Sequence, residues 1–205
     1  MSRRHAPPAP PVVGGVPANH SGENNHPPQL VVVHSAVMDC RPGAARLLGA
    51  WNRAGTTGGS WHYAVDPEET IQCSWDRFVT WAAPPNRTSW GGVLHIEMAD
   101  RPAPAPTVRG RALQKLRQTW RWRRPEQQRM LLRTAELVAQ LCLAYDLPPR
   151  YVGPIGQRAG RKGWTTHAAR TIAYRQSTHW DPGFWPRRKF GRLVAARYSQ
   201  LAGAS

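Results

Sequence analysis

Two histidines and one aspartate, far apart in the chain, are of the right types to bind one metal ion. His34 ends an apolar run over residues 30–34, His167 follows two threonines, and Asp181 precedes a proline and Gly183. Two imidazoles and one carboxylate can hold zinc and leave a fourth position for water, whose pKa the ion lowers toward about 7. The three segments together predict an open zinc site at which water is activated.

Each of these residues also has a purely structural interpretation. A histidine at the end of an apolar strand, such as His34, is often only a hydrogen-bonded residue, and the same applies to His167. The ends of strands in α/β sheets are, however, where ligands usually bind. Proline forces the residue before it into an extended conformation, and glycine permits a tight turn, so we expect Asp181 on a constrained loop.

A second carboxylate lies in an apolar segment, residues 93–98, that has the pattern of a strand. Side chains alternate between the two faces of a strand, so His95 and Glu97 should point the same way. A glutamate in a buried strand is costly unless it is paired or functional. Glu97 is therefore either the partner of an arginine or a base that takes a proton from zinc-bound water.

The elements that must position these residues indicate an α/β fold, with a mixed central sheet flanked by helices. Residues 151–177 have little periodicity and several glycines, so we expect a loop there. The apolar patterns predict strands over residues 29–33, 61–66, 70–73 and 93–98, the second and third forming a hairpin, and helices from Ala44 to Gly55 and over residues 125–145 and 187–201.

Composition divides the 205 residues into a flexible leader over residues 1–28 and one domain over residues 29–205. The leader is rich in proline and glycine and has few large apolar residues, so it cannot bury enough surface to fold. No apolar stretch suited to a secretory signal or a membrane span is found. Residues 102–106 alternate proline and alanine and suggest a stiff connector. We expect the protein to be synthesised in the cytoplasm and not to insert into a membrane.

The chain carries 28 Lys and Arg against 12 Asp and Glu, a net charge of +16. Such a charge attracts nucleic acid, anionic lipid or the acidic polymers of a bacterial wall, or it serves solubility alone. Seven basic and no acidic residues lie from Arg109 to Arg124, with Trp120 and Trp122 among them. This segment is either an amphipathic helix with a solvated basic face or a surface for an anionic wall polymer, although nucleic-acid bases could stack there equally well.

Several segments in order resemble zinc N-acetylmuramoyl-L-alanine amidases, a family that includes phage endolysins and is similar in fold to the peptidoglycan recognition proteins. The resemblance covers about residues 29–198. It rests on residues 31–35, 61–66, 70–72, 80–82, 94–97, 166–167 and 179–183.

The resemblance implies a role for each matched residue. It implies that His34, His167 and Asp181 bind Zn²⁺ and that Glu97 is the catalytic acid and base. It also implies that Tyr63 lies near the metal and contacts the substrate or the developing oxyanion.

Two positions depart from the family pattern. His179 stands where the family often has a lysine that stabilises the tetrahedral intermediate, and an imidazolium can do the same work. His95 stands where glycine is usual, and it either tunes Glu97 or crowds the site. Because His179 and Asp181 are two residues apart in an extended segment, both could face the metal, which leaves the third ligand open.

The expected function is a peptidoglycan hydrolase that cleaves the amide between N-acetylmuramic acid and L-alanine during host lysis. It would stay in the host cytoplasm until released to the wall, with peptidoglycan and anionic wall polymers as partners. The alternatives are a peptidoglycan-binding module without catalysis and, less favoured, a basic nucleic-acid-binding protein. Asp181 and Glu97 are both present, which favours the enzyme.

Overall fold

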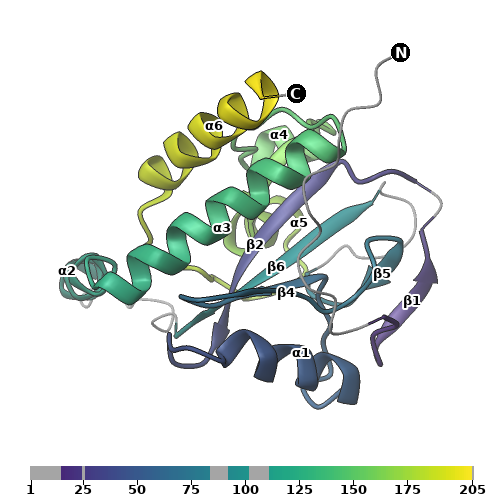
Figure 1. The fold of residues 1–205 in the computed structure, drawn as a ribbon, viewed down its shortest axis with the longest axis horizontal. Coiled ribbons are helices and arrows are strands. Elements are labelled where there is room, and N and C mark those ends of the chain that lie inside the picture. The colour runs from purple at the N-terminus through teal and green to yellow at the C-terminus, as the bar shows by residue number, and fades with distance from the viewer. Residues whose placement is uncertain (1–14, 25, 84–91, 102–110, 205) are drawn as a thin grey trace.

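The computed structural model describes residues 15–24, 26–83, 92–101 and 111–204, which form a mixed sheet with helices on both sides (Figure 1). The five-stranded sheet has the order β4-β3-β6-β2-β7, and a two-stranded sheet pairs β1 with β5. The predicted fold class is confirmed. The strands are β1 His20–Glu23, β2 Leu30–Val37, β3 Tyr63–Val65, β4 Thr70–Gln72, β5 Phe78–Thr80, β6 Val93–Asp100 and β7 Gly163–Thr166.

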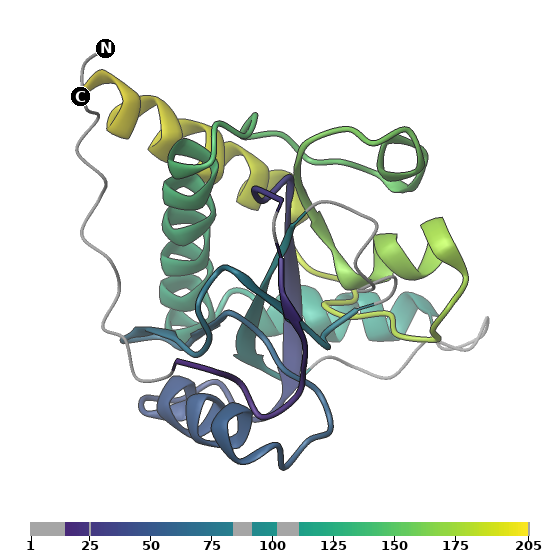
Figure 2. The ribbon, with the colours of Figure 1, turned by 90° about the vertical axis from the view of Figure 1, so that its right-hand side faces the viewer.

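The helices lie on both sides of the large sheet (Figures 1 and 2). Helix α3 packs across one face, and α6 packs on α3, with Phe190 of α6 fully buried. Helix α1 packs against β3, β4 and β6, where Gly49 allows it to approach Ile71 and Cys73. The helices are α1 Ala44–Ala54, α2 Arg111–Arg121, α3 Pro125–Ala144, α4 Pro154–Arg158, α5 His167–Tyr174 and α6 Arg187–Gly203.

Strand β2 lies between two parallel neighbours, and this determines which side chains meet. It pairs with β6 along its whole length, and the register sets His34 opposite Glu97. It pairs with β7 only as far as Val33, which lies opposite Thr166. Because side chains at paired positions share a face, His34 and Glu97 point to the same side of the sheet. The chain leaves β7 at His167, immediately beside the end of this pairing.

The long periodic segments fold as predicted. Helix α1 ends at Gly55, which has a φ of 68°, and α3 begins with Pro125 in its first turn. The predicted hairpin is confirmed, because β3 and β4 pair antiparallel. The C-terminal helix is confirmed as α6.

The predicted loop over residues 151–177 was wrong. This segment contains α4, β7 and α5. Each is too short for periodicity to reveal, and tertiary contacts hold them: the Thr165 hydroxyl donates to the Val152 carbonyl at 2.7 Å. Thr166 caps α5, since its Oγ1 accepts a hydrogen bond from the Ala169 N–H at 3.2 Å.

The structure also differs from the expectation of a flexible leader over residues 1–28. Strand β1 lies within that segment and pairs antiparallel with β5. Arg77 and Glu23 form an ion pair of 2.9 Å beside this small sheet. Residues 1–14 and 25 of the expected leader, and the expected connector over residues 102–106, lie outside the described residues.

No helix among the described residues is long and apolar enough to cross a lipid bilayer.

Gly163 tests whether β7 can accommodate a side chain at this position. It has a φ of +143°, and an added Cβ would lie 2.4 Å from the Arg150 carbonyl oxygen. We expect Gly163→Ala to lower the free energy of unfolding by about 2 kcal/mol or more. Gly160 is a matched control, because it has a φ of +67° but nothing within 4 Å of an added Cβ.

Gly160→Ala should lower stability by only about 1 kcal/mol, the strain of a left-handed residue alone. Chemical denaturation of both variants measures the difference. Equal losses would contradict the steric account of β7.

Candidate metal centre and active site

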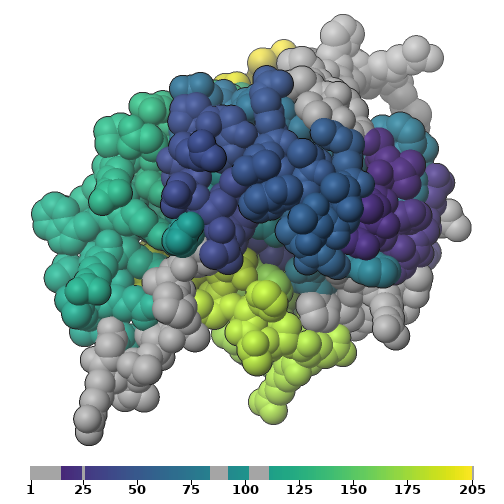
Figure 3. All heavy atoms as spheres, turned by 90° about the horizontal axis from the view of Figure 1, so that it is seen from below, coloured from purple at the N-terminus to yellow at the C-terminus, as the bar shows by residue number. Residues whose placement is uncertain are grey.

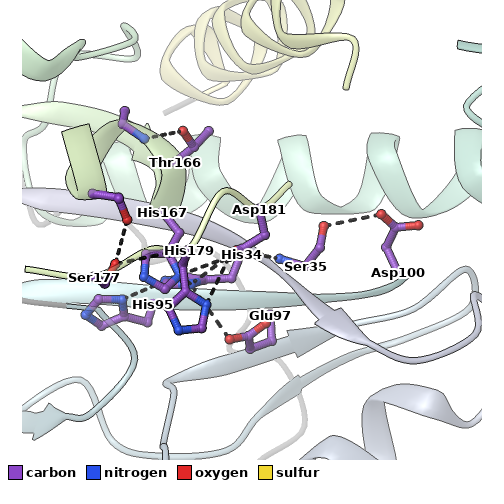
Figure 4. Close-up of polar contacts among 12 residues, drawn as sticks. His34, Ser35, His95, Glu97, Asp100, Thr166, His167, Ser177, His179 and Asp181 are labelled. Carbon is purple, nitrogen blue, oxygen red and sulfur yellow. Dashed lines mark hydrogen bonds and ion pairs between the residues drawn. The ribbon is translucent and has the colours of Figure 1, made fainter. Parts of the chain in front are cut away.

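His34, in the middle of β2, lies together with His167 and Asp181 just beyond the point where the pairing of β2 with β7 ends (Figure 4). The two imidazole Nδ1 atoms are 3.0 Å apart. Asp181 Oδ1 lies 3.1 Å from His167 Nδ1, and Asp181 Oδ2 lies 3.6 Å from His34 Nδ1. All three residues are buried. Groups separated by 133 residues of chain thus share one small buried volume.

Each of the three groups is held by a different element. His34 belongs to β2, and His167 is the first residue of α5. Asp181 lies in the segment after α5, where its Oδ2 accepts a hydrogen bond from the Ser35 N–H at 3.2 Å. Its carbonyl accepts another from the Ala168 N–H at 2.9 Å. The turn expected at Gly183 is present, with a φ of +70°.

The protonation states of this cluster favour metal binding. Burial, followed by the nearby His167, lowers the pKa of His34 well below its usual value, so His34 is a neutral imidazole with a free lone pair. Burial alone would raise the pKa of Asp181. The hydrogen bond with His167, the charges that the two histidines carry when they are protonated, and the Ser35 N–H outweigh it and lower that pKa. A carboxylate with a lowered pKa beside a neutral imidazole is in the form that can bind a cation.

The spacing of the donor atoms fits zinc. Tetrahedral ligands about 2.0–2.1 Å from a zinc ion lie about 3.3 Å from one another. The separations here are 3.0 Å between the two nitrogens and 3.1 and 3.6 Å from the nitrogens to the two Asp181 oxygens, and they bracket that value. Two nitrogens and one carboxylate oxygen form a donor set that zinc accepts while keeping an open position. The residues present therefore fit the ion.

Two further histidines, His95 and His62, lie on the Nε2 side of His34, opposite the metal cluster. His34 Nε2 lies 2.9 Å from His95 Nδ1, and the His62 ring stacks on that of His95. His62 Nδ1 accepts the backbone N–H of His95 at 3.0 Å, so its proton must lie on Nε2, which donates to the Phe78 carbonyl at 2.9 Å. Burial lowers the pKa values of both supporting imidazoles. Such outer hydrogen bonds fix the orientation of a ligand ring.

Glu97 lies beside the cluster on the same face as His34 and His95, as the alternation predicts. Its Oε1 is 3.8 Å from His34 Nδ1. Burial, and then the charge of Asp181, raise its pKa well above the usual value. A buried carboxyl with a raised pKa next to donor atoms is suited to exchange protons. A bound cation would oppose that shift.

His179 lies on the solvent side of the cluster. Its side chain is 66% exposed, and its Nδ1 is 3.8 Å from Asp181 Oδ1. Its ring stacks on His167 with the centroids 4.5 Å apart. Among the two candidates for the third position, Asp181 thus lies within the cluster and His179 lies outside it.

The expectation that Tyr63 lies near the metal was wrong. Tyr63 pairs with Ile96 in the sheet, whereas Ala64 pairs with Glu97. Alternation therefore turns Tyr63 away from Glu97, toward the face that α3 covers. Its hydroxyl donates to Asp76 Oδ1 at 2.7 Å, and Tyr145, at the end of α3, donates to the other oxygen of Asp76.

Arg170 is a neighbour of the site that the sequence did not reveal. It lies in α5, is buried, and adds positive charge near His34 and His95. Burial lowers the pKa of its guanidinium to about 10. The sequence did not reveal Arg170 because residues 151–177 were assigned to a loop. The direction of its side chain can be inferred only once it is known to lie in a helix.

Comparisons with known proteins agree with this geometry. The model of the N-acetylmuramoyl-L-alanine amidase family matches residues 24–184. No curated protein sequence matches the chain. The fold is similar to that of the Staphylococcus aureus hydrolase AmiA in complex with its ligand, at 15% identity and a TM-score of 0.64, covering 95% of this chain and 86% of that chain.

Two endolysin structures are also similar. A mutant endolysin from Bacillus subtilis has 13% identity and a TM-score of 0.52, covering 91% of this chain and 99% of that chain. The endolysin amidase LysCS from Clostridium intestinale has 13% identity and a TM-score of 0.51, covering 94% and 99%. The chain belongs to the N-acetylmuramoyl-L-alanine amidase family. It is an amidase that hydrolyses peptidoglycan.

The position of Tyr63, away from the metal cluster, predicts that its hydroxyl contributes to stability and not to catalysis. Tyr63→Phe removes one hydrogen bond to Asp76 and should lower the free energy of unfolding by about 1 kcal/mol, because Tyr145 still donates to that carboxylate. Amidase turnover should stay within about twofold of the wild-type value.

Tyr145→Phe is the matched control, because it removes the other tyrosine hydrogen bond to Asp76 and should behave in the same way. Unfolding curves and turnover on purified peptidoglycan test both variants. A hundredfold loss of turnover confined to Tyr63→Phe would show that the Tyr63 hydroxyl acts in catalysis and would contradict this prediction.

Proposed function

We propose that this amidase cleaves the amide between N-acetylmuramic acid and L-alanine with a zinc ion held by His34, His167 and Asp181. The observation that supports the ion is the convergence of two buried imidazoles and the Asp181 carboxylate. The imidazole Nδ1 atoms are 3.0 Å apart, and the two carboxylate oxygens lie 3.1 and 3.6 Å from them. The observation that supports the substrate is the family match over residues 24–184. Together they assign one reaction to one site.

The chain's own residues divide the work. When bound, zinc supplies Lewis-acid chemistry, polarising a carbonyl and lowering the pKa of water. Glu97 accepts a proton from the attacking water and returns it to the leaving nitrogen of L-alanine. Its position 3.8 Å from His34 Nδ1, on the same face of the sheet, supports this role. His95 and His62 hold His34 in the orientation that directs Nδ1 to the cluster.

His179 is the proposed donor to the oxyanion. Its exposed ring lies over His167 at the open side of the cluster, where a substrate can reach it. A hydrogen bond to the developing oxyanion stabilises the transition state more than the ground state. This role replaces that of the lysine that the family often has at this position.

The biological role we propose is lysis of a bacterial host by an endolysin that a partner releases from the cytoplasm to the wall. The structural similarity to endolysins supports it. The net charge of +16 also suits a protein that works among anionic wall polymers.

Digestion of purified peptidoglycan with and without a chelator tests the reaction. Free L-alanine amino termini should appear with the untreated enzyme, disappear with the chelator, and return when zinc is added. Mass analysis of the released fragments distinguishes the products. New reducing sugar ends would instead identify a glycosidase, and chelator-resistant release of L-alanine termini would refute the metal.

Glu97→Gln separates the proton carrier from the metal ligands. It should retain one zinc per chain and lose turnover by about 10²–10⁴-fold, the range for removal of a general acid or base. Metal content by atomic absorption and turnover on the same preparation provide the two readouts. His167→Ala is the contrasting variant and should lose both. Loss of zinc from Glu97→Gln would instead identify Glu97 as a metal ligand.

A further inference from the structure

Helix α2 is oriented opposite to the usual arrangement, with polar residues inward and apolar residues outward. Leu113, Leu116 and Trp120 recur at intervals of three and four and so share one face of the helix. These three side chains are 54%, 55% and 61% exposed. The buried position of the helix is Gln118, at 3% exposure, on the opposite face. The apolar face of α2 is therefore presented to the surroundings.

Polar contacts hold the inner face of α2 in place. Arg121 forms an ion pair of 2.9 Å with the buried Asp100 at the end of β6. Asp100 is also bound by Gln127, at 3.1 Å, and by Ser35, at 3.3 Å. Gln118 lies against Gly183, two residues beyond Asp181, since an added Cβ there would meet its Oε1 at 3.2 Å. The orientation is thus fixed by specific partners.

Basic residues surround the exposed apolar side chains. Lys115 and Arg117 are exposed within the helix, and Arg123 and Arg124 are exposed just beyond it. The Arg123 guanidinium lies over the Trp120 ring, 4.8 Å from its centroid. A hollow in this surface is lined by Leu116, Arg117, Trp120, Arg121, Arg123 and Arg124. The segment lies at one end of the domain, beside the beginning of α3, and forms part of the outer edge of the molecule (Figures 1 and 3).

Among anionic partners, a lipid surface matches both properties of this face. A sugar-phosphate polymer satisfies the arginines, and its rings can stack on Trp120, but it offers nothing apolar to two exposed leucines. An anionic bilayer offers negative headgroups and, directly beneath them, an apolar layer. A helix with a basic polar margin and a face of leucine and tryptophan binds in the plane of that interface. No acidic residue lies between Arg109 and Arg124 to repel the headgroups.

We propose that the outward face of α2, Leu113, Leu116 and Trp120 with its margin of Lys115, Arg117, Arg123 and Arg124, binds the surface of an anionic lipid bilayer. The 11 residues of α2 are too few to span a bilayer, so the helix lies in the headgroup region. Because Gln118 contacts Gly183 near Asp181, the bound face lies on a segment adjoining the metal centre. Binding there would keep the enzyme at the membrane side of the wall.

Co-sedimentation of the full chain with lipid vesicles tests the proposal. The probes are vesicles of phosphatidylglycerol and phosphatidylcholine in equal amounts and vesicles of phosphatidylcholine alone. We expect binding to the first and at least about tenfold weaker binding to the second, with the difference falling as salt is raised. Failure to bind anionic vesicles, or equal binding to both, would overturn the proposal, and neither result depends on amidase activity.

Two variants separate the apolar and the ionic contributions. Leu113→Ser with Leu116→Ser keeps every charge and should weaken binding to anionic vesicles at least about tenfold. Arg117→Gln with Arg123→Gln should weaken it to a similar extent. Leu132→Ser is the matched control, because Leu132 is 51% exposed on α3, and it should bind as the wild type does.

Soluble poly(glycerol phosphate) serves as a competitor that has the charge of a wall polymer without an apolar layer. It should bind the double leucine variant and the wild type equally. If the leucine variant kept full affinity for vesicles while the arginine variant lost it, the surface would be a site for polyanions in general and the lipid proposal would be wrong. Circular dichroism confirms that each variant is folded.

Discussion

The structure depends on one arrangement, a carboxylate and two imidazoles with their donor atoms 3.0–3.6 Å apart in a buried place. Burying an ionised carboxylate costs free energy unless an opposite charge or several hydrogen bonds accompany it. Burial keeps the His34 imidazole neutral, so it cannot supply that charge. The cation that we propose would resolve this conflict. The surrounding hydrogen bonds, from Ser35 to Asp181 and between His34 and His95, hold the donor atoms in position for it.

Residues carried by long, regular elements could be placed from the sequence. His34 and Glu97 lie on β2 and β6, whose apolar runs are recognisable and whose pairing then sets the two side chains together. His167 and Asp181 could be named as candidate metal ligands from residue types and order. Their positions in the fold could not be predicted. The elements that position them, β7 and α5, are short and are held by distant contacts that no local pattern records.

Tyr63 and α2 illustrate a different limit, the choice between two faces. The strand containing Tyr63 was predicted, but the pattern could not tell which face turns toward Glu97, and the register reversed the expectation. The amphipathic pattern of α2 was likewise visible. An apolar face normally packs inward. Here the ion pair between Arg121 and the buried Asp100 turns the polar face inward instead.

The proposed mechanism requires that one zinc ion is bound by His34, His167 and Asp181. Crystals grown with zinc, measured on both sides of the zinc absorption edge, test it most directly. We expect one strong anomalous peak within about 2.0–2.2 Å of His34 Nδ1, His167 Nδ1 and an Asp181 oxygen. A fully occupied peak elsewhere, or no peak between these groups in a protein that remains active, would contradict it.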